Sequence, residues 1–144
     1  MSRDAVILAA GMGRRMGGPK ALLDLGGTTL LELQLRALQG ARFIIIVVSP
    51  ELWEARPGPI LDASRTRYVL NPRPEEGPFL SIRLGLEALD GGGPVLVVPV
   101  DCPVPPGAPQ RLSGAAAPGL AWLAPTHDGR RGHPVLLTAA GVAA

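Results

Sequence analysis

The first twenty residues of the chain constrain its fold more than any other stretch. Residues 4–10 read D-A-V-I-L-A-A, a short apolar run that is typical of a buried β-strand. Residues 11–19 follow as G-M-G-R-R-M-G-G-P, and Lys20 comes next. Glycine lets the backbone approach a ligand closely, and successive backbone N–H groups in such a loop form a concavity that suits anions. Because Arg14, Arg15 and Lys20 add full positive charge, this stretch predicts a phosphate-binding site.

Two common phosphate-binding motifs do not fit this loop. The dinucleotide fingerprint G-x-G-x-x-G fails because Met16 occupies its third small position, and the second apolar run, at 43–48, is not followed by an acidic residue. The P-loop pattern fails because Pro19 precedes Lys20 and Ala21 follows it. Lys20 is the only lysine of the chain, which indicates either a functional ammonium or chance in an arginine-rich composition. The loop is therefore expected to bind phosphate in another way.

Helices and strands are expected to alternate along the rest of the chain. Thr29 and Glu32 have the spacing of a capping box, which predicts a helix over 29–39. A second helix is expected from Pro78 to the triple glycine at 91–93, since proline is well tolerated in a first helical turn. Further strands are expected at 43–48, 68–70, 94–100, 120–124 and 134–137.

This alternation predicts a single α/β domain over residues 1–144, with a mostly parallel sheet between two layers of helices. Gly85 inside the second helix costs roughly 1 kcal/mol relative to alanine, so we expect it to allow close packing on the sheet. Only one helical turn is expected after Pro103, near residues 110–112, and residues 126–133 are interpreted as a connecting segment.

Polar features follow several of the expected strands. The glycine loop, Asn71 and Asp101 each come directly after an apolar run. Ligands of parallel α/β sheets bind at the carboxyl ends of the strands, near a topological switch point. We therefore expect these three features, which come from separate parts of the chain, to share one crevice.

Asp101 is the candidate metal ligand. A carboxylate at a strand end is a hard oxygen ligand, and proteins usually hold Mg²⁺ by one or two carboxylates together with substrate phosphates. The other interpretation is an aspartate that caps a turn, but the nearby phosphate loop favours the metal. Cys102 has no histidine near it in sequence and is interpreted as a small packing residue.

Phosphoryl-type transfer requires mainly positioning and neutralisation of charge. Lys20, Arg15 and Mg²⁺ at Asp101 can supply both to an α-phosphate and its pyrophosphate leaving group. The chain offers no convincing pair of nucleophile and base, which is consistent with an acceptor that is already an anion, such as a phosphate monoester.

Residues around the second helix have two interpretations. Asn71, Gly77 and Ser81 bracket the start of this helix, whose first turn offers free N–H groups and the positive end of a dipole. They either bind the nucleotide or cap the helix locally. Residues 130–133 either face an anionic acceptor or form a solvated turn.

Composition argues against several classes of partner. Aromatic residues make up 3% of the chain and the net charge is only +2, so no nucleic acid is expected as a partner. No apolar run approaches the roughly 20 residues of a membrane helix, so no membrane partner is expected. The single cysteine rules out an internal disulfide and favours the cytoplasm.

Four motifs resemble those of one known family. The run L-A-A-G-M-G-R-R-M-G-G-P-K-A-L-L-D-L-G-G, from Leu8, resembles the signature of the MobA-like nucleotidyltransferases, and most of all of the molybdenum cofactor cytidylyltransferases. N-P-R-P-E-E-G-P-F-L-S-I-R-L-G-L from Asn71, V-P-V-D-C-P from Val98 and R-R-G-H-P-V-L-L from Arg130 resemble its second, magnesium and acceptor-side motifs. The resemblance covers about residues 6–137 and implies the Rossmann-like fold of the nucleotide-diphospho-sugar transferases.

The resemblance also implies roles for individual residues. It implies nucleotide contacts in three groups: Ala9, Ala10 and Gly11 at the base or ribose, Gly13, Arg14 and Arg15 at the phosphates, and Asn71, Gly77 and Ser81 over the nucleoside. It implies that Lys20 lies on the α-phosphate and acts in catalysis together with Arg15 and Asp101, with Asp101 holding Mg²⁺.

Two details favour CTP over GTP as the nucleotide. The guanylyl branch usually has L-A-G-G where this chain has L-A-A-G, and D-K where it has Pro19-Lys20. That branch also tends to small residues where Ser81 and Ile82 stand. Family members usually continue past G-H-P with another helix and an acidic-glycine motif, so the C-terminal part of the family fold is expected to be missing.

The expected function is Mg²⁺-dependent transfer of CMP from CTP to a phosphorylated molybdopterin-type cofactor, with release of pyrophosphate. The alternatives are guanylyl transfer to the same cofactor, nucleotidyl transfer to a sugar phosphate, and a shortened, inactive module that binds nucleotide.

Overall fold

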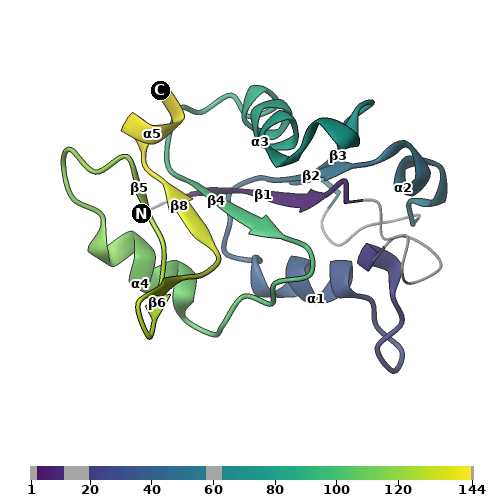
Figure 1. Ribbon diagram of the computed structural model, residues 1–144, viewed down its shortest axis with the longest axis horizontal. Coiled ribbons are helices and arrows are strands. Elements are labelled where there is room, and N and C mark those ends of the chain that lie inside the picture. The colour runs from purple at the N-terminus through teal and green to yellow at the C-terminus, as the bar shows by residue number, and fades with distance from the viewer. Residues whose placement is uncertain (1–2, 12–19, 58–62, 144) are drawn as a thin grey trace.

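The computed structural model describes residues 3–11, 20–57 and 63–143. Within them, a six-stranded sheet has the order β3-β2-β1-β4-β8-β5 (Figure 1). Its strands are β1 (Asp4–Ala9), β2 (Ile44–Val48), β3 (Thr66–Leu70), β4 (Val95–Pro99), β5 (Trp122–Leu123) and β8 (Val135–Leu137). The first four are parallel, and β8 pairs antiparallel with both β4 and β5. The predicted mostly parallel sheet is confirmed.

Helices flank this sheet, and a small hairpin stands apart from it. The helices are α1 (Leu30–Ala37), α2 (Pro50–Ala55), α3 (Pro78–Glu87), α4 (Ala108–Ala115) and α5 (Ala139–Ala143). The 3₁₀ segments are η2 (Lys20–Leu22) and η3 (Pro74–Glu76), and the hairpin consists of β6 (Thr126–His127) and β7 (Arg130–Arg131). No helix among the described residues is long and apolar enough to span a bilayer.

The sheet separates two apolar layers. Ala5, Ile7 and Ala9 of β1 belong to one buried cluster with side chains of α1, α2 and α4. Val6 belongs to the other, against which Leu86 near the end of α3 packs. Figure 1 shows α1 and α4 on one side of the sheet and α3 and α5 on the other. Because both faces are covered, the central strands consist of unbroken apolar runs, and the predicted three-layer arrangement is confirmed.

The start of α1 follows the predicted cap. The Thr29 hydroxyl accepts a hydrogen bond from the Glu32 N–H at 3.1 Å, and the Glu32 carboxylate accepts one from the Thr28 hydroxyl at 2.9 Å. The cap satisfies an N–H group that has no partner within the helix.

Gly85 allows the close packing of α3 that the sequence predicts. A Cβ at this position would lie 2.5 Å from Cγ1 of Val6 and 3.3 Å from Cγ2 of Val47. The buried residues of α3 are Ser81 and Gly85, whereas Ile82 is only partly buried. The closest approach of α3 to the sheet is therefore made where the helix carries its smallest residue, Gly85.

One expectation for the C-terminal third was wrong. The helix expected as one turn at 110–112 has eight residues, because Ala108, Pro109 and Leu112 bury one of its faces. The segment at 126–133 forms a hairpin, since Asp128 and Gly129 have φ angles of 52° and 78° and so make a tight two-residue turn.

Candidate active site

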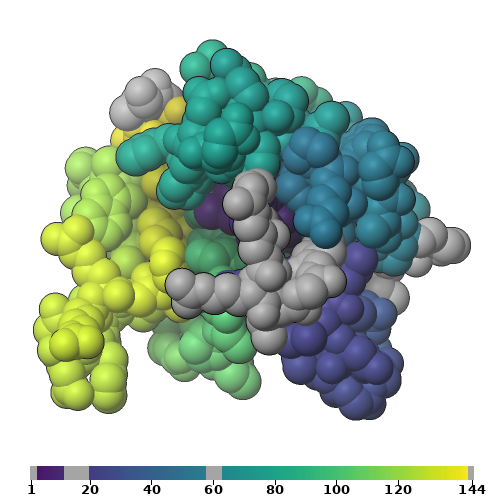
Figure 2. Space-filling model, turned by 45° about the vertical axis from the view of Figure 1, so that its right-hand side comes forward, coloured from purple at the N-terminus to yellow at the C-terminus, as the bar shows by residue number. Residues whose placement is uncertain are grey.

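The candidate site lies at the topological switch point of the sheet. The chain leaves β1 for β2 and β3 on one side and returns as β4 on the other. The Val100 N–H donates to the Leu8 carbonyl at 3.0 Å, so β1 and β4 are still paired where both end. Figure 2 brings this edge forward and shows atoms of β1 and β4 in a hollow beneath α3. This is the crevice in which parallel α/β sheets bind ligands.

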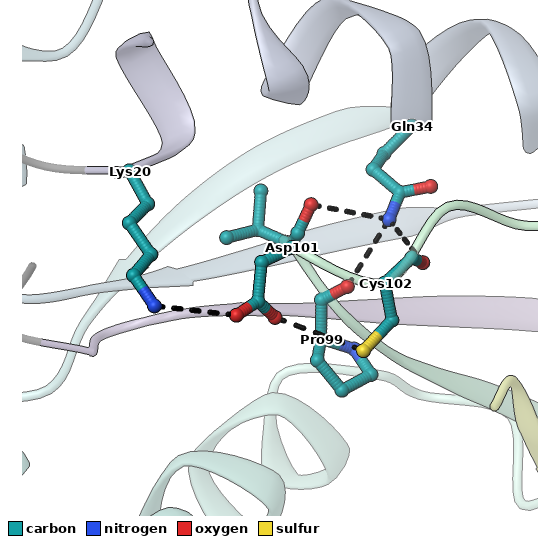
Figure 3. Close-up of polar contacts among 6 residues, drawn as sticks. Lys20, Gln34, Pro99, Asp101 and Cys102 are labelled. Carbon is teal, nitrogen blue, oxygen red and sulfur yellow. Dashed lines mark hydrogen bonds and ion pairs between the residues drawn. The ribbon is translucent and has the colours of Figure 1, made fainter. Parts of the chain in front are cut away.

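Lys20 and Asp101 meet at this edge (Figure 3). The Lys20 Nζ lies 3.4 Å from Oδ2 of Asp101, with the two side chains 44% and 48% exposed. The backbone of Lys20 is held by η2, whose Ala21 is buried in the core. Asp101 and the residue that follows the glycine loop, which were expected at one edge of the sheet, therefore meet there. Because the pair is half exposed, it contributes little to stability and is significant mainly for its position.

Cys102 lies against the other oxygen of the same carboxylate. Its Sγ is 3.7 Å from Oδ1 of Asp101. Burial raises the pKa of the Cys102 thiol, the charge and hydrogen bond of Asp101 raise it further, and the charge of Lys20 lowers it. The pKa of this thiol, the single one of the chain, therefore depends on both charged groups of the site.

Asp101 fits a site in which substrate supplies most of the metal ligands. The described residues contain no group of three His, Cys, Asp or Glu side chains that could hold a metal ion. Asp101 is a half-exposed carboxylate at a strand end, and one carboxylate together with substrate phosphates is a usual way to hold Mg²⁺. Asp101 is therefore placed where it could hold a divalent metal ion together with substrate phosphates.

Asn71 and Ser81 contact each other directly. Both are buried, and Nδ2 of Asn71 donates to Oγ of Ser81 at 2.9 Å. The Asn71 Oδ1 accepts from the Arg73 N–H at 2.8 Å. This arrangement joins the end of β3 to the first turn of α3, although α3 has no side-chain cap hydrogen bond of its own. Gly77 precedes α3 with φ at 96°, a conformation that only glycine adopts readily. Nucleotide contacts of these three residues stay a prediction.

The end of β1 leads into an exposed glycine with open space beside its backbone. Ala9 and Ala10 are buried, and a Cβ added to the exposed Gly11 would meet nothing within 4 Å. Gly13, Arg14 and Arg15 lie outside the described residues. Arg130 and Arg131 lie on the β6–β7 hairpin, and the Arg131 guanidinium stacks over the Trp122 ring, 5.0 Å from its centre.

One residue of the site was missed by the sequence interpretation. Gln34 of α1 is 2% exposed, and its amide nitrogen donates toward carbonyl oxygens of the segment that carries Asp101. The available signal was a polar residue within the apolar stripe of an amphipathic helix, between Leu31 and Leu38.

Comparison with known families agrees with this geometry. The sequence model described as the MobA-like NTP transferase domain matches residues 5–144. The chain belongs to this family. A molybdenum cofactor guanylyltransferase of Shewanella sp. (strain MR-4) is 35% identical over 147 residues, which cover 93% of this chain and 66% of that relative. A 2-C-methyl-D-erythritol 4-phosphate cytidylyltransferase of Streptomyces avermitilis is 39% identical over 102 residues, 65% of this chain and 40% of the relative. The chain thus spans less than two thirds of the length of either relative.

Solved structures with the same fold include nucleotidyltransferases. Rv0371c from Mycobacterium tuberculosis H37Rv matches with a TM-score of 0.79 and 25% identity, over 96% of this chain and 71% of that one. The inositol-1-phosphate CTP transferase from T. maritima matches with a TM-score of 0.70 and 22% identity, over 84% of this chain and 51% of that one. The fold is therefore that of the nucleotide-diphospho-sugar transferases.

Proposed function

We propose that this chain catalyses metal-dependent nucleotidyl transfer from a nucleoside triphosphate to a phosphorylated small molecule, with release of pyrophosphate. The observation that carries the proposal is the pairing of Lys20 with Asp101 at the switch point, 3.4 Å apart and half exposed. A pair of this kind is worth about 0–1 kcal/mol, so either partner can exchange it for a ligand at small cost.

The reaction needs little from the protein beyond charge and position. An oxygen of the acceptor phosphate attacks the α-phosphorus, a new P–O bond forms, and the bond to the pyrophosphate oxygen breaks. Lys20 neutralises charge on the phosphates, and Arg14 and Arg15 are proposed to do the same at the pyrophosphate. Mg²⁺ held by Asp101 would supply Lewis-acid stabilisation of the same charge. The phosphate acceptor is already an anion, so it needs no general base.

For the acceptor, we propose a phosphorylated pterin cofactor of the molybdopterin type. Support comes from the guanylyltransferases of the molybdenum cofactor, which align with nearly the whole of this chain. For the nucleotide we propose CTP, on the L-A-A-G and Pro19-Lys20 sequences of the first motif. GTP is the second candidate, because the relatives that cover most of the chain are named as guanylyltransferases.

A pyrophosphate-release assay tests the proposal. CTP, GTP, ATP and UTP are each supplied with Mg²⁺ and either molybdopterin or a sugar phosphate. We expect release with CTP and molybdopterin. We expect Lys20→Met to lower kcat/KM by about 100-fold, since its charge counts mainly in the transition state.

Arg36→Met is the matched control for this substitution. It removes one positive charge from the exposed face of α1 and should leave turnover unchanged. An unaltered rate in Lys20→Met would remove Lys20 from the mechanism. If no combination releases pyrophosphate but a triphosphate still raises the unfolding temperature, the chain is a binding module instead.

A further inference from the structure

Gln34 is the buried polar side chain of α1, and it lies within the apolar face of that helix. It is 2% exposed and thus as buried as its neighbours Leu31 and Leu35, whose apolar side chains belong to the core. Burying an amide costs free energy unless the amide is hydrogen-bonded. The partners of Gln34 therefore indicate why an amide is present there.

The side-chain nitrogen of Gln34 contacts a single turn of the chain (Figure 3). Nε2 lies 2.7 Å from the carbonyl oxygen of Cys102, 3.1 Å from that of Pro99 and 3.3 Å from that of Val100. Carbonyl oxygens only accept hydrogen bonds, so the nitrogen and not the oxygen of the amide must face them. An apolar side chain of the same length could fill this space but could donate to none of the three.

This turn carries Asp101. The Cys102 N–H donates to the Pro99 carbonyl at 3.1 Å, which closes a four-residue turn with Asp101 in its third position. The pairing of β4 with β1 ends with the bond from Val100 to Leu8. Asp101 therefore lies just beyond the sheet, and Gln34 ties its turn to α1.

We propose that Gln34 is a positioning residue, which fixes the Pro99–Cys102 turn so that the carboxylate of Asp101 stays beside Lys20. That Gln34 fixes the turn does not depend on any reaction of the chain. That Gln34 also affects the binding of a metal at Asp101 rests on the proposed function.

Two variants separate this role from a general contribution to packing. Gln34→Met keeps the length of the side chain and removes its donors. Leu38→Met places the same side chain on the buried face of the same helix, one turn further on. Thermal unfolding of both variants measures the loss of stability that each causes.

Cys102 reports on the turn directly, because it is the only cysteine of the chain and lies within the turn. We expect Gln34→Met to increase the rate of Cys102 alkylation by iodoacetamide roughly three- to tenfold, the factor that corresponds to one typical hydrogen bond. Leu38→Met should leave this rate unchanged.

Binding of Mn²⁺ in the presence of CTP, followed by electron paramagnetic resonance, reports on Asp101. We expect Gln34→Met to raise the Kd for Mn²⁺ by a similar factor, and Leu38→Met to leave it unchanged. If Gln34→Met does not unfold cooperatively, Gln34→Asn replaces it, because it keeps the amide and withdraws it by one methylene.

Each outcome decides one point. An unchanged rate of alkylation in the Gln34 variant, or an equal change in Leu38→Met, overturns the claim that Gln34 fixes the turn. Faster alkylation with an unchanged Kd for Mn²⁺ overturns the positioning of Asp101. If the wild-type protein gains no Mn²⁺ site with any triphosphate, the proposed function fails, while the alkylation rates still decide whether Gln34 fixes the turn.

Discussion

Cys102 experiences opposite electrostatic effects from the two charged residues of the candidate site. After burial, Asp101 is the largest influence that raises the pKa of its thiol, and Lys20 lowers that pKa. Asp101→Asn should therefore lower the pKa of Cys102 and increase the fraction of reactive thiolate at neutral pH. Lys20→Met should raise the pKa and decrease that fraction. The pH profile of Cys102 alkylation measures both shifts.

The control for these shifts is Arg36→Met, which changes the net charge as Lys20→Met does but away from the turn. Its profile should coincide with that of the wild-type protein. Shifts of the same sign in the Asp101 and Lys20 variants would contradict the opposite effects of these two charges on the pKa of the thiol.

Individual residues differed in how far the sequence could place them. Lys20 and Asp101 each follow a strand, and parallel strands end at a common edge, so their meeting was predictable. The contacts of Gln34 were not predictable, because its partners lie on a different element. Helical periodicity shows that a polar residue lies on the buried face of α1, but not what that residue contacts. For Asn71 and Ser81 the sequence left two interpretations, and the bond between them depends on where α3 packs.

At the scale of elements, the contact between α3 and the sheet depends on the missing side chain of Gly85. Gly85→Ala would bring a Cβ within 2.5 Å of Val6, so the core must shift. We expect a loss of about 1–3 kcal/mol in the free energy of unfolding from overpacking, against a gain of up to about 1 kcal/mol in helix propensity. Urea denaturation measures the net loss.

Gly114→Ala is the matched control, because Gly114 also lies within a helix but a Cβ there would meet nothing within 4 Å. Only the propensity gain applies, so this variant should be more stable than the wild type. A stabilised Gly85→Ala would mean that α3 stands further from β1 than its packing indicates.

Elements were predictable where one signal dominates. The central strands are unbroken apolar runs with glycine or proline beyond them, and they were placed within one or two residues of their ends. Helix α4 contains Gly114, which opposes a helix locally, and packing of its apolar face overrides this effect. Its Pro109 lies in the first turn, where proline is tolerated. The hairpin had the Asp128-Gly129 turn signal, but its arms are polar and show no strand periodicity.

At the scale of the whole molecule, two groups of charged residues lie at opposite ends of the strands. One stabilises the fold at the start of β1, and the other belongs to the candidate active site beyond the end of β4. Asp4 is buried at the start of β1, where its carboxylate accepts from Nε and Nη2 of Arg42 at 3.1 and 3.0 Å and from the Phe43 N–H at 3.2 Å. In the pairing of β1 with β4, Asp4 lies opposite Val95 and Leu8 lies opposite Pro99. At about 3.3 Å per residue, the two ends are separated by roughly 13 Å.

This separation predicts that stability and ligand binding can be changed independently. In Asp4→Asn, the new amide nitrogen would face the donors of Arg42, so one of these hydrogen bonds is lost and the unfolding temperature should fall by several degrees. Affinity for a triphosphate should stay at the wild-type value, because sites more than about 7–10 Å apart without shared partners behave additively. In the double variant with Asp101→Asn, the change in unfolding temperature should equal the sum of the two single changes. Calorimetry with and without CTP measures both quantities, and a clear departure from the sum would mean that β1 and β4 transmit strain from one edge of the sheet to the other.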